Sequence, residues 1–249
     1  MRGAVGKYTG DFIVKGSLYK GGEYINYKQC YNSIVRHIID INKDSYEIDI
    51  FQHCWNKDLE NELVELYKPK VYCFEDNNIY ADEISSLCRT ETDFSGISQA
   101  LTIKKSLEIK EYYEHINNIQ YDIVILYRYD VLLWKDINLK DYDSEKIYVN
   151  AHPDSNGDFH FIMNNQNATL FKYLYDSLKY NNPYIMHFWI KQYVNRFMGK
   201  ILYMDAIQPG VDQEVFRKID DWSIKPGYLS IETFNSYLVP LNLNDAPPS

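Results

Sequence analysis

The chain has 249 residues, 45% of them hydrophobic, which is enough for the core of one large α/β domain or two small ones. Its net charge of −9 argues against a surface for nucleic acid or an anionic membrane, since either needs a basic patch. No apolar run approaches the roughly 18 residues of a membrane span. The first residues also lack the apolar segment of a signal peptide. We therefore expect a soluble protein that stays where it is made.

Strand and helix patterns alternate over the first ~130 residues. Apolar spacing predicts a helix over 27–38, a strand over 46–55, a helix over 59–66 ended by Pro69, and a strand over 70–76. The polar stretch from Asn77 to Ser95 is predicted to be a long loop. A helix through Ile109 and Ile116 then leads into a strand at 121–130. This alternation predicts a mainly parallel sheet wrapped by helices, with ligands at the carboxyl ends of the strands.

The second half has a looser pattern. Strands are predicted at 146–152, 158–164 and 201–206, with helices at 170–178 and 185–193, the latter ended by Gly199. We see no internal repeat and no linker. The prediction is therefore a single domain over 1–249, with a looser α+β C-terminal half.

Four cysteines are present, at Cys30, Cys54, Cys73 and Cys88. They form no C-x-x-C pair and no other short metal-binding spacing, and they are too sparse for a disulfide scaffold. We expect reduced, mostly buried thiols.

The strand "YDIVILYRYD" (121–130) is apolar until its end, where Arg128 and Asp130 follow. Side chains two residues apart lie on the same face of a strand, so this pair is predicted to point the same way. A carboxylate at the end of a central strand is suited to a divalent cation that grips nucleotide phosphates. A plain Arg–Asp ion pair that closes the strand explains the spacing equally well.

Four segments occur in an order that resembles nucleotide-sugar-dependent glycosyltransferases of the GT-A fold. They are "IDIFQHCWNKDLENELVELYKPK", "SGISQALTIKKSLEIKEYYEHI", "YDIVILYRYDVLLWKDI" and "NGDFHFIMN". Such enzymes occur in giant viruses, phages and bacterial surface-polysaccharide clusters. The resemblance covers most of the chain, up to about Met204. It implies a nucleotide-binding half over about 1–130 and an acceptor half over about 131–249, in the cytoplasm (the host cytoplasm if the protein is viral).

The resemblance also implies a metal and a donor site. In that fold an acidic D-x-D element binds the metal and the sugar diphosphate, whereas here the triplet is Arg128-Tyr129-Asp130. Asp130 is expected to hold Mn²⁺ or Mg²⁺, or hydroxyl groups of the donor. Arg128 is the alternative partner for the diphosphate, through bidentate hydrogen bonds. This departure from the pattern puts metal dependence in doubt.

Further donor contacts are expected at the start of the chain and after the second strand. Gly3 allows close approach of the backbone and Arg2 meets phosphate, while His53 and Trp55 lie where the base or ribose would be. Ser98 and Gln99 begin the helix that leads to the site. The competing interpretations are a core aromatic for Trp55 and a helix cap for Ser98 and Gln99.

Asp158 and His160 form a second group, two residues apart in "GDFHFIMN". An inverting transferase needs a base to remove the proton of the acceptor hydroxyl, and Asp158 is the first candidate. His160 is expected to orient Asp158 or to complete a metal shell. A solvent-facing strand with a chance acidic residue is the competing interpretation.

The sequence thus predicts a glycosyltransferase that moves a sugar from a nucleoside-diphosphate donor to a glycan or another hydroxyl acceptor. One alternative is a catalytically inactive carbohydrate- or nucleotide-binding module, which the incomplete acidic triplet permits. Another is a nucleotidyl- or phosphotransferase on a related fold, although the P-loop pattern is absent. The sequence predicts no nucleic-acid partner and leaves the sugar, the base, the acceptor, the stereochemistry and the oligomeric state open.

Overall fold

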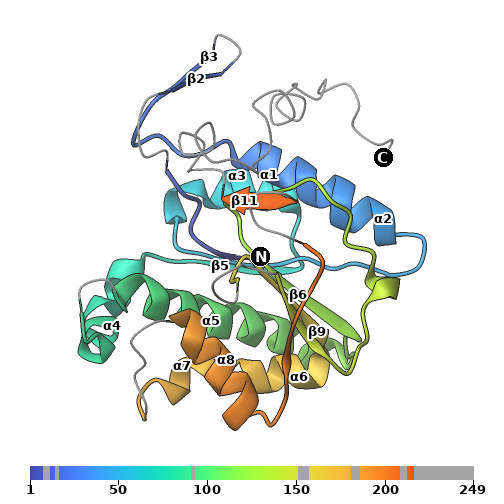
Figure 1. Cartoon of the computed structure of the whole chain (residues 1–249). Helices are drawn as coiled ribbons and strands as arrows, with labels where there is room; N and C mark the ends of the chain where they lie inside the picture. The colour runs from blue at the N-terminus through green and yellow to red at the C-terminus, as the bar shows by residue number, and fades with distance from the viewer. Residues whose placement is uncertain are drawn as a thin grey trace.

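The computed structural model has a sheet through the middle of the molecule and helices on both sides of it (Figure 1). It describes residues 1–7, 12–14, 17–90, 93–150, 157–180, 186–207 and 212–215, which include every candidate site residue. The strands are β1 (Arg2–Gly3), β2 (Phe12–Val14), β3 (Ser17–Tyr19), β4 (Phe51–Cys54), β5 (Val71–Phe74), β6 (Ile123–Tyr127), β7 (Val131–Leu133), β8 (Ile147–Val149), β9 (His160–Asn164), β10 (Leu202–Met204) and β11 (Gln213–Val215). The α-helices are α1 (Tyr27–Ile34), α2 (Asp40–Asn42), α3 (Glu60–Tyr67), α4 (Ala81–Leu87), α5 (Asp93–Asn117), α6 (Asn165–Phe171), α7 (Leu174–Ser177) and α8 (Met186–Arg196). A π-helical turn, η1 (Val35–Ile39), joins α1 to α2, and 3-10 turns are η2 (Lys57–Leu59), η3 (Asn77–Tyr80) and η4 (Leu139–Asp141).

Among the described residues, seven strands form a parallel part and a mixed part of the central sheet, and the other strands form two antiparallel pairs, β2 with β3 and β7 with β11. The parallel part has the order β1-β4-β5, and the mixed part has the order β10-β8-β9-β6, in which β9 runs antiparallel to both β6 and β8. A parallel bridge between Arg2 and Arg128 joins the two parts at β1 and the end of β6. The predicted α/β fold, with a mainly parallel first half and a looser second half, is confirmed.

Both faces of the sheet are buried, which explains the unbroken apolar run in β6. Val124 and Leu126 pack into a core with α5, α7 and α8, whereas Tyr127 packs on the opposite face into a core with α1 and α3. Figure 1 shows α1, α2 and α3 on one side of the sheet and α5 to α8 on the other. The alternation of side chains along a strand therefore feeds two separate cores.

Two predictions about local structure were wrong. The stretch from Asn77 to Ser95 is not a long loop, because η3 and α4 occupy most of it and α5 already begins at Asp93. The helix α4 has only seven residues and is fixed by fully buried Ile84, so tertiary packing decides it more than its own periodicity. The helix predicted over 170–178 is split into the end of α6 and α7.

The four cysteines are free thiols, as predicted. The expectation that most of them are buried is only half right, because Cys30 and Cys54 are buried whereas Cys73 and Cys88 are partly exposed. Within the described ranges, no helix combines the length and the apolar character needed to cross a membrane.

Candidate functional site

The winding of the sheet reverses between β1 and β6. From β1 the chain builds β4 and β5 on one side, and it then returns through α5 to place β6 on the other side of β1. In open α/β sheets, ligands bind outside the carboxyl ends of the strands at such a reversal. Arg2 and Arg128 are the bridged residues at this point. The fold therefore directs attention to the carboxyl edge of β1 and β6.

Arg128 and Asp130 form a bidentate ion pair directly after β6. Arg128 Nε donates to Asp130 Oδ1 at 2.9 Å and Arg128 Nη2 donates to Oδ2 at 2.8 Å. The Asp130 side chain is only 3% exposed, so this pair is largely removed from water. The two side chains lie together, as predicted, but the reason given for it was wrong, because β6 ends at Tyr127 and Tyr129 and Asp130 form a turn after it. This contact is also the one that the ion-pair interpretation requires, so the pair alone does not identify a ligand site.

Asp158 joins the pair from a distant part of the chain. Its Oδ2 accepts hydrogen bonds from Arg128 Nη1 at 3.3 Å and from Gln99 Nε2 at 2.7 Å. The preceding Gly157 packs so tightly against the Asn150 side chain that a Cβ would lie 1.8 Å from its Nδ2. The peptide before β9 is thereby held against β8, and the Asp158 carboxylate is held against α5 and the end of β6.

Arg2 supplies a second guanidinium at the same edge. It is 1% exposed, donates to the carbonyl oxygen of Asp158 and lies over the ring of Phe161. Burial, followed by the positive charge of Arg128, lowers the pKa of Arg2 to about 10, against the opposite effect of Asp158 and Asp130. Its Nε has no hydrogen-bond partner among the described residues. An unpaired donor on a buried cation is costly, and an anion that reaches it would relieve that cost.

Gly3 and His53 share one hydrogen-bond network. The Gly3 amide donates to Thr102 Oγ1 at 3.1 Å, and the same oxygen lies 2.6 Å from His53 Nδ1. Burial lowers the pKa of His53 to about 4, although its contact with Glu75 acts in the opposite direction. The imidazole is therefore neutral near pH 7. Gly3 has a φ of 98°, a left-handed conformation that favours glycine at the end of β1.

Trp55 is partly exposed and stands edge-on to the ring of His53, with 4.4 Å between the ring centroids. It also packs at the margin of the core beside Tyr80. Trp55 therefore packs against the core, as the core-aromatic interpretation predicts, and it also remains partly accessible to solvent. Ser98 is buried within α5, five residues after the helix begins, so neither it nor Gln99 is a cap.

His160 lies apart from Asp158. It is fully buried, its Nε2 is 2.5 Å from Asp205 Oδ2 and its Nδ1 is 3.2 Å from Gln213 Oε1. Its ring also stacks on Tyr127, with an interplanar angle of 4°. Both ring nitrogens are thus engaged with Asp205 and Gln213, and these contacts join β9 to the chain after β10 and to β11.

Sequence reasoning missed three participants around His53. Glu75 Oε1 lies 2.9 Å from His53 Nε2 and 2.7 Å from Lys105 Nζ, and Thr102 completes the network from α5. Burial alone would raise the pKa of Glu75, but hydrogen bonds from Lys105, His53 and Tyr80 outweigh it and lower that pKa. The signal for Glu75 was its place directly after β5. Thr102 and Lys105 carried no signal, because nothing in a helix sequence tells which strand end it will face.

The carboxylates at β6 fit a divalent cation poorly in this arrangement. Both oxygens of Asp130 already accept from Arg128, and Asp158 accepts from the same guanidinium. Mg²⁺ and Mn²⁺ prefer several oxygen ligands that surround the ion. Here the Arg128 guanidinium lies where the ion would have to bind between the two carboxylates. We therefore derive no step through a metal bound to Asp130.

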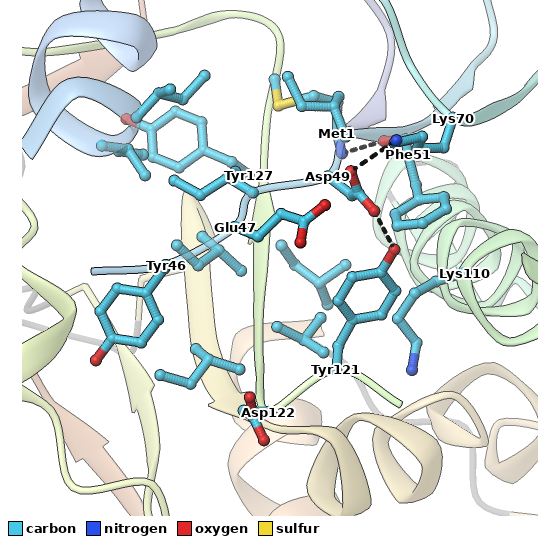
Figure 2. Close-up of a pocket in the computed structure, with 18 of the residues that line it drawn as sticks. Met1, Tyr46, Glu47, Asp49, Phe51, Lys70, Lys110, Tyr121, Asp122 and Tyr127 are labelled. Carbon is cyan, nitrogen blue, oxygen red and sulfur yellow. Dashed lines mark hydrogen bonds and ion pairs between the residues drawn. The ribbon is translucent and has the colours of Figure 1, made fainter. Parts of the chain in front are cut away.

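A cavity of about 580 Å³ lies at the opposite, amino-terminal edge of the sheet. Its lining comes mainly from β6 and from the segments that precede β4, β5 and β6, together with α1, η1 and the second half of α5. Figure 2 shows Glu47, Asp49 and Tyr121 around this space. Tyr121 donates to Asp49 Oδ2 at 2.6 Å, and Lys70 Nζ lies 3.4 Å from Asp49 Oδ1. None of the ten candidate site residues lines this cavity.

Comparison of the chain with protein-family models and with curated proteins finds no match. The function must therefore be argued from the site itself.

Proposed function

We propose that this protein is a glycosyltransferase that uses a nucleoside-diphosphate sugar and binds the diphosphate at the carboxyl edge of β1 and β6. The observation that carries the proposal is the pair of guanidiniums, Arg2 and Arg128, on adjacent strands where the winding of the sheet reverses. Guanidinium groups bind phosphate oxygens through paired hydrogen bonds, and two of them match the charge of a diphosphate better than one. The order of the four sequence segments supports the same activity.

Binding of a donor at this edge requires the diphosphate to replace existing ion pairs of Arg128. The positive charges of Arg2 and Arg128 balance the negative charges of Asp130 and Asp158, and Arg128 forms ion pairs with both carboxylates. A diphosphate that reached Arg128 would compete with those carboxylates for the same guanidinium. Replacing a carboxylate by the diphosphate at Arg128 is favourable only if the released carboxylate gains another hydrogen-bond partner. For Asp158, the hydroxyl group of the acceptor is such a partner.

The chemical step then needs one base and one stabilised leaving group. The acceptor oxygen bonds to the anomeric carbon as the bond from that carbon to the phosphate oxygen breaks, and the nucleoside diphosphate leaves with the electron pair. Asp158 takes the proton of the acceptor hydroxyl, while Gln99 holds its carboxylate in place. Arg128 and Arg2 stabilise the charge that develops on the diphosphate. Around them, Trp55 and Gly3 are proposed to contact the nucleoside, and Ser98 lies on the turn of α5 that carries Gln99. His53, which was expected to join them, is fully buried with both ring nitrogens engaged, so we assign it no contact with the donor.

A binding module without turnover is the second candidate, because the bidentate pair occupies both oxygens of Asp130. The decisive experiment measures thermal shifts with a panel of nucleoside-diphosphate sugars, and then the release of nucleoside diphosphate with glycan acceptors. We expect one donor to stabilise the protein and to be turned over.

The variant Asp158→Asn is expected to keep the thermal shift and to lose turnover. Asp82→Asn is the matched control, because Asp82 is an exposed carboxylate on α4, outside this site. If the wild type bound a donor without turning it over, the binding module would be the function that remains. No stabilisation by any donor would refute the proposal.

A further inference from the structure

Three side chains with the chemistry of zinc ligands meet at the ends of β4 and β5. They are His53, Cys73 and Glu75, and their ligand atoms all lie within 4.8 Å of one another. The sheet brings them together, because His53 and Cys73 are register partners of two parallel strands and Glu75 follows Cys73 by two residues on the same face. The cluster is separate from the pair Arg128–Asp130, and its donors do not follow any spacing that the sequence alone would flag.

Two further side chains hold the donors in place. Thr102 Oγ1 lies 2.6 Å from His53 Nδ1, which leaves Nε2 directed toward Glu75. Tyr80 donates to Glu75 Oε2 at 2.8 Å, which leaves Oε1 on the side of the histidine. Outer contacts of this kind orient the ligands of protein metal sites and fix the tautomer of a ligating histidine.

We propose that His53 Nε2, Cys73 Sγ and Glu75 Oε1 bind Zn²⁺. A set of one imidazole, one thiolate and one carboxylate is suited to zinc, whereas Mg²⁺ and Mn²⁺ prefer oxygen ligands. Three protein ligands leave the fourth tetrahedral position to water. On binding, the Cys73 thiol gives its proton to solvent as the zinc–sulfur bond forms, and the proton of His53 resides on Nδ1, where it donates to Thr102. The inference does not rest on the proposed transferase activity.

Lys105 competes with the metal for one ligand. Its Nζ lies 2.7 Å from Glu75 Oε1, so zinc must displace this ammonium to reach the carboxylate. The lysine has a place to remain, because it also donates to the Tyr80 hydroxyl at 2.6 Å and lies over the Tyr80 ring, 4.5 Å from its centroid. Lys105 therefore sets the affinity for zinc, and removing its charge should strengthen binding.

Titration of the purified full chain with Co²⁺, a spectroscopic substitute for zinc, tests the site. We expect a sulfur-to-cobalt charge-transfer band in the near ultraviolet, together with the visible bands of tetrahedral cobalt, and displacement of both by Zn²⁺. Cys73→Ser should abolish the charge-transfer band. Cys88→Ser is the matched control, since Cys88 is also partly exposed but lies at the end of α4, and it should leave the band intact.

Lys105→Met provides the second measurement. We expect it to bind Zn²⁺ about tenfold more tightly than the wild type, since it removes an ion pair that competes for Glu75. The absence of a charge-transfer band in both the wild type and Lys105→Met would overturn the proposal. So would a band that survives in Cys73→Ser, or weaker zinc binding in Lys105→Met, with folding of each variant checked by circular dichroism.

Discussion

The two edges of the sheet differ in what they offer a ligand. The carboxyl edge has the buried Arg2, the partly buried Arg128 and two carboxylates that pair with Arg128, and none of these residues lines the cavity at the amino edge. The amino edge has a cavity of about 580 Å³, lined largely by isoleucine and tyrosine side chains with carboxylates among them. The volume of the cavity favours the amino edge as a place for a ligand. The topology of the sheet and the charged side chains favour the carboxyl edge.

A cavity and a cluster of charged side chains thus lie at different edges of the same sheet. Apolar pockets of this size commonly bind small molecules, yet a cavity also forms where connecting segments fail to fill the space beneath a twisted sheet. At the carboxyl edge, groups from four separate elements converge at hydrogen-bond distance. That convergence requires coordinated packing, and it is the reason why the proposed transfer reaction is assigned to this edge.

Removing one cation from the carboxyl edge should abolish most of the activity. Arg128→Gln is expected to lower donor turnover by about 10²–10³-fold, because it removes the charge that stabilises the departing diphosphate. Ile50→Phe, which narrows the amino-edge cavity, should change turnover by less than about twofold. Steady-state release of nucleoside diphosphate measures both. If Ile50→Phe abolished turnover while Arg128→Gln did not, the site would belong to the amino edge.

The ion pairs of the two edges should also differ in their contribution to stability. Arg128→Met leaves Asp130 buried without its cation and should lower the free energy of unfolding by about 3–5 kcal/mol. Lys70→Met breaks a pair whose lysine is 46% exposed and should cost less than about 1 kcal/mol. Urea denaturation measures both values. If both variants lost the same free energy of unfolding, the pair Arg128–Asp130 would be no more shielded from water than the pair Lys70–Asp49.

Removing a single hydrogen bond should affect activity at the carboxyl edge and stability at the amino edge. Gln99→Leu removes the amide that positions Asp158 and should lower kcat by about tenfold with little change in KM. Tyr121→Phe removes the hydrogen bond to Asp49 and should cost about 1 kcal/mol of stability with turnover unchanged. A fall in kcat for Tyr121→Phe would show that the amino edge takes part in the reaction.

Divalent cations should have the smallest effect. In the Cys73→Ser background, which lacks one proposed zinc ligand, EDTA followed by Mn²⁺ or Mg²⁺ is expected to change donor turnover by less than about twofold. The reason is that Arg128 already occupies both oxygens of Asp130. Loss of activity in EDTA that Mn²⁺ restores would return Asp130 to the role of metal ligand.

Much of the fold followed from local patterns, but only part of the site did. The apolar run of β6 and the helices on either side of it predicted the parallel sheet, because burial on both faces selects such residues. The run 77–95 was misread, since α4 is too short for its own periodicity to decide its structure. His160 showed the spacing expected of a partner for Asp158, yet its ring contacts Asp205 and Gln213.

The spacing of Arg128 and Asp130, which are two residues apart, was enough to predict that their side chains lie together, because so short a separation is a local feature of the chain. The structure keeps them together although Tyr129 and Asp130 form a turn after β6 and not the end of a strand. The meeting of Arg2, Gln99 and Asp158 depends on the packing of the whole chain, since they come from β1, from α5 and from the segment before β9. The tertiary structure likewise decided that His53 faces Cys73 and Glu75 across two strands. The physical reason is that strand order and register bring distant residues together, and no pattern within a single segment records them.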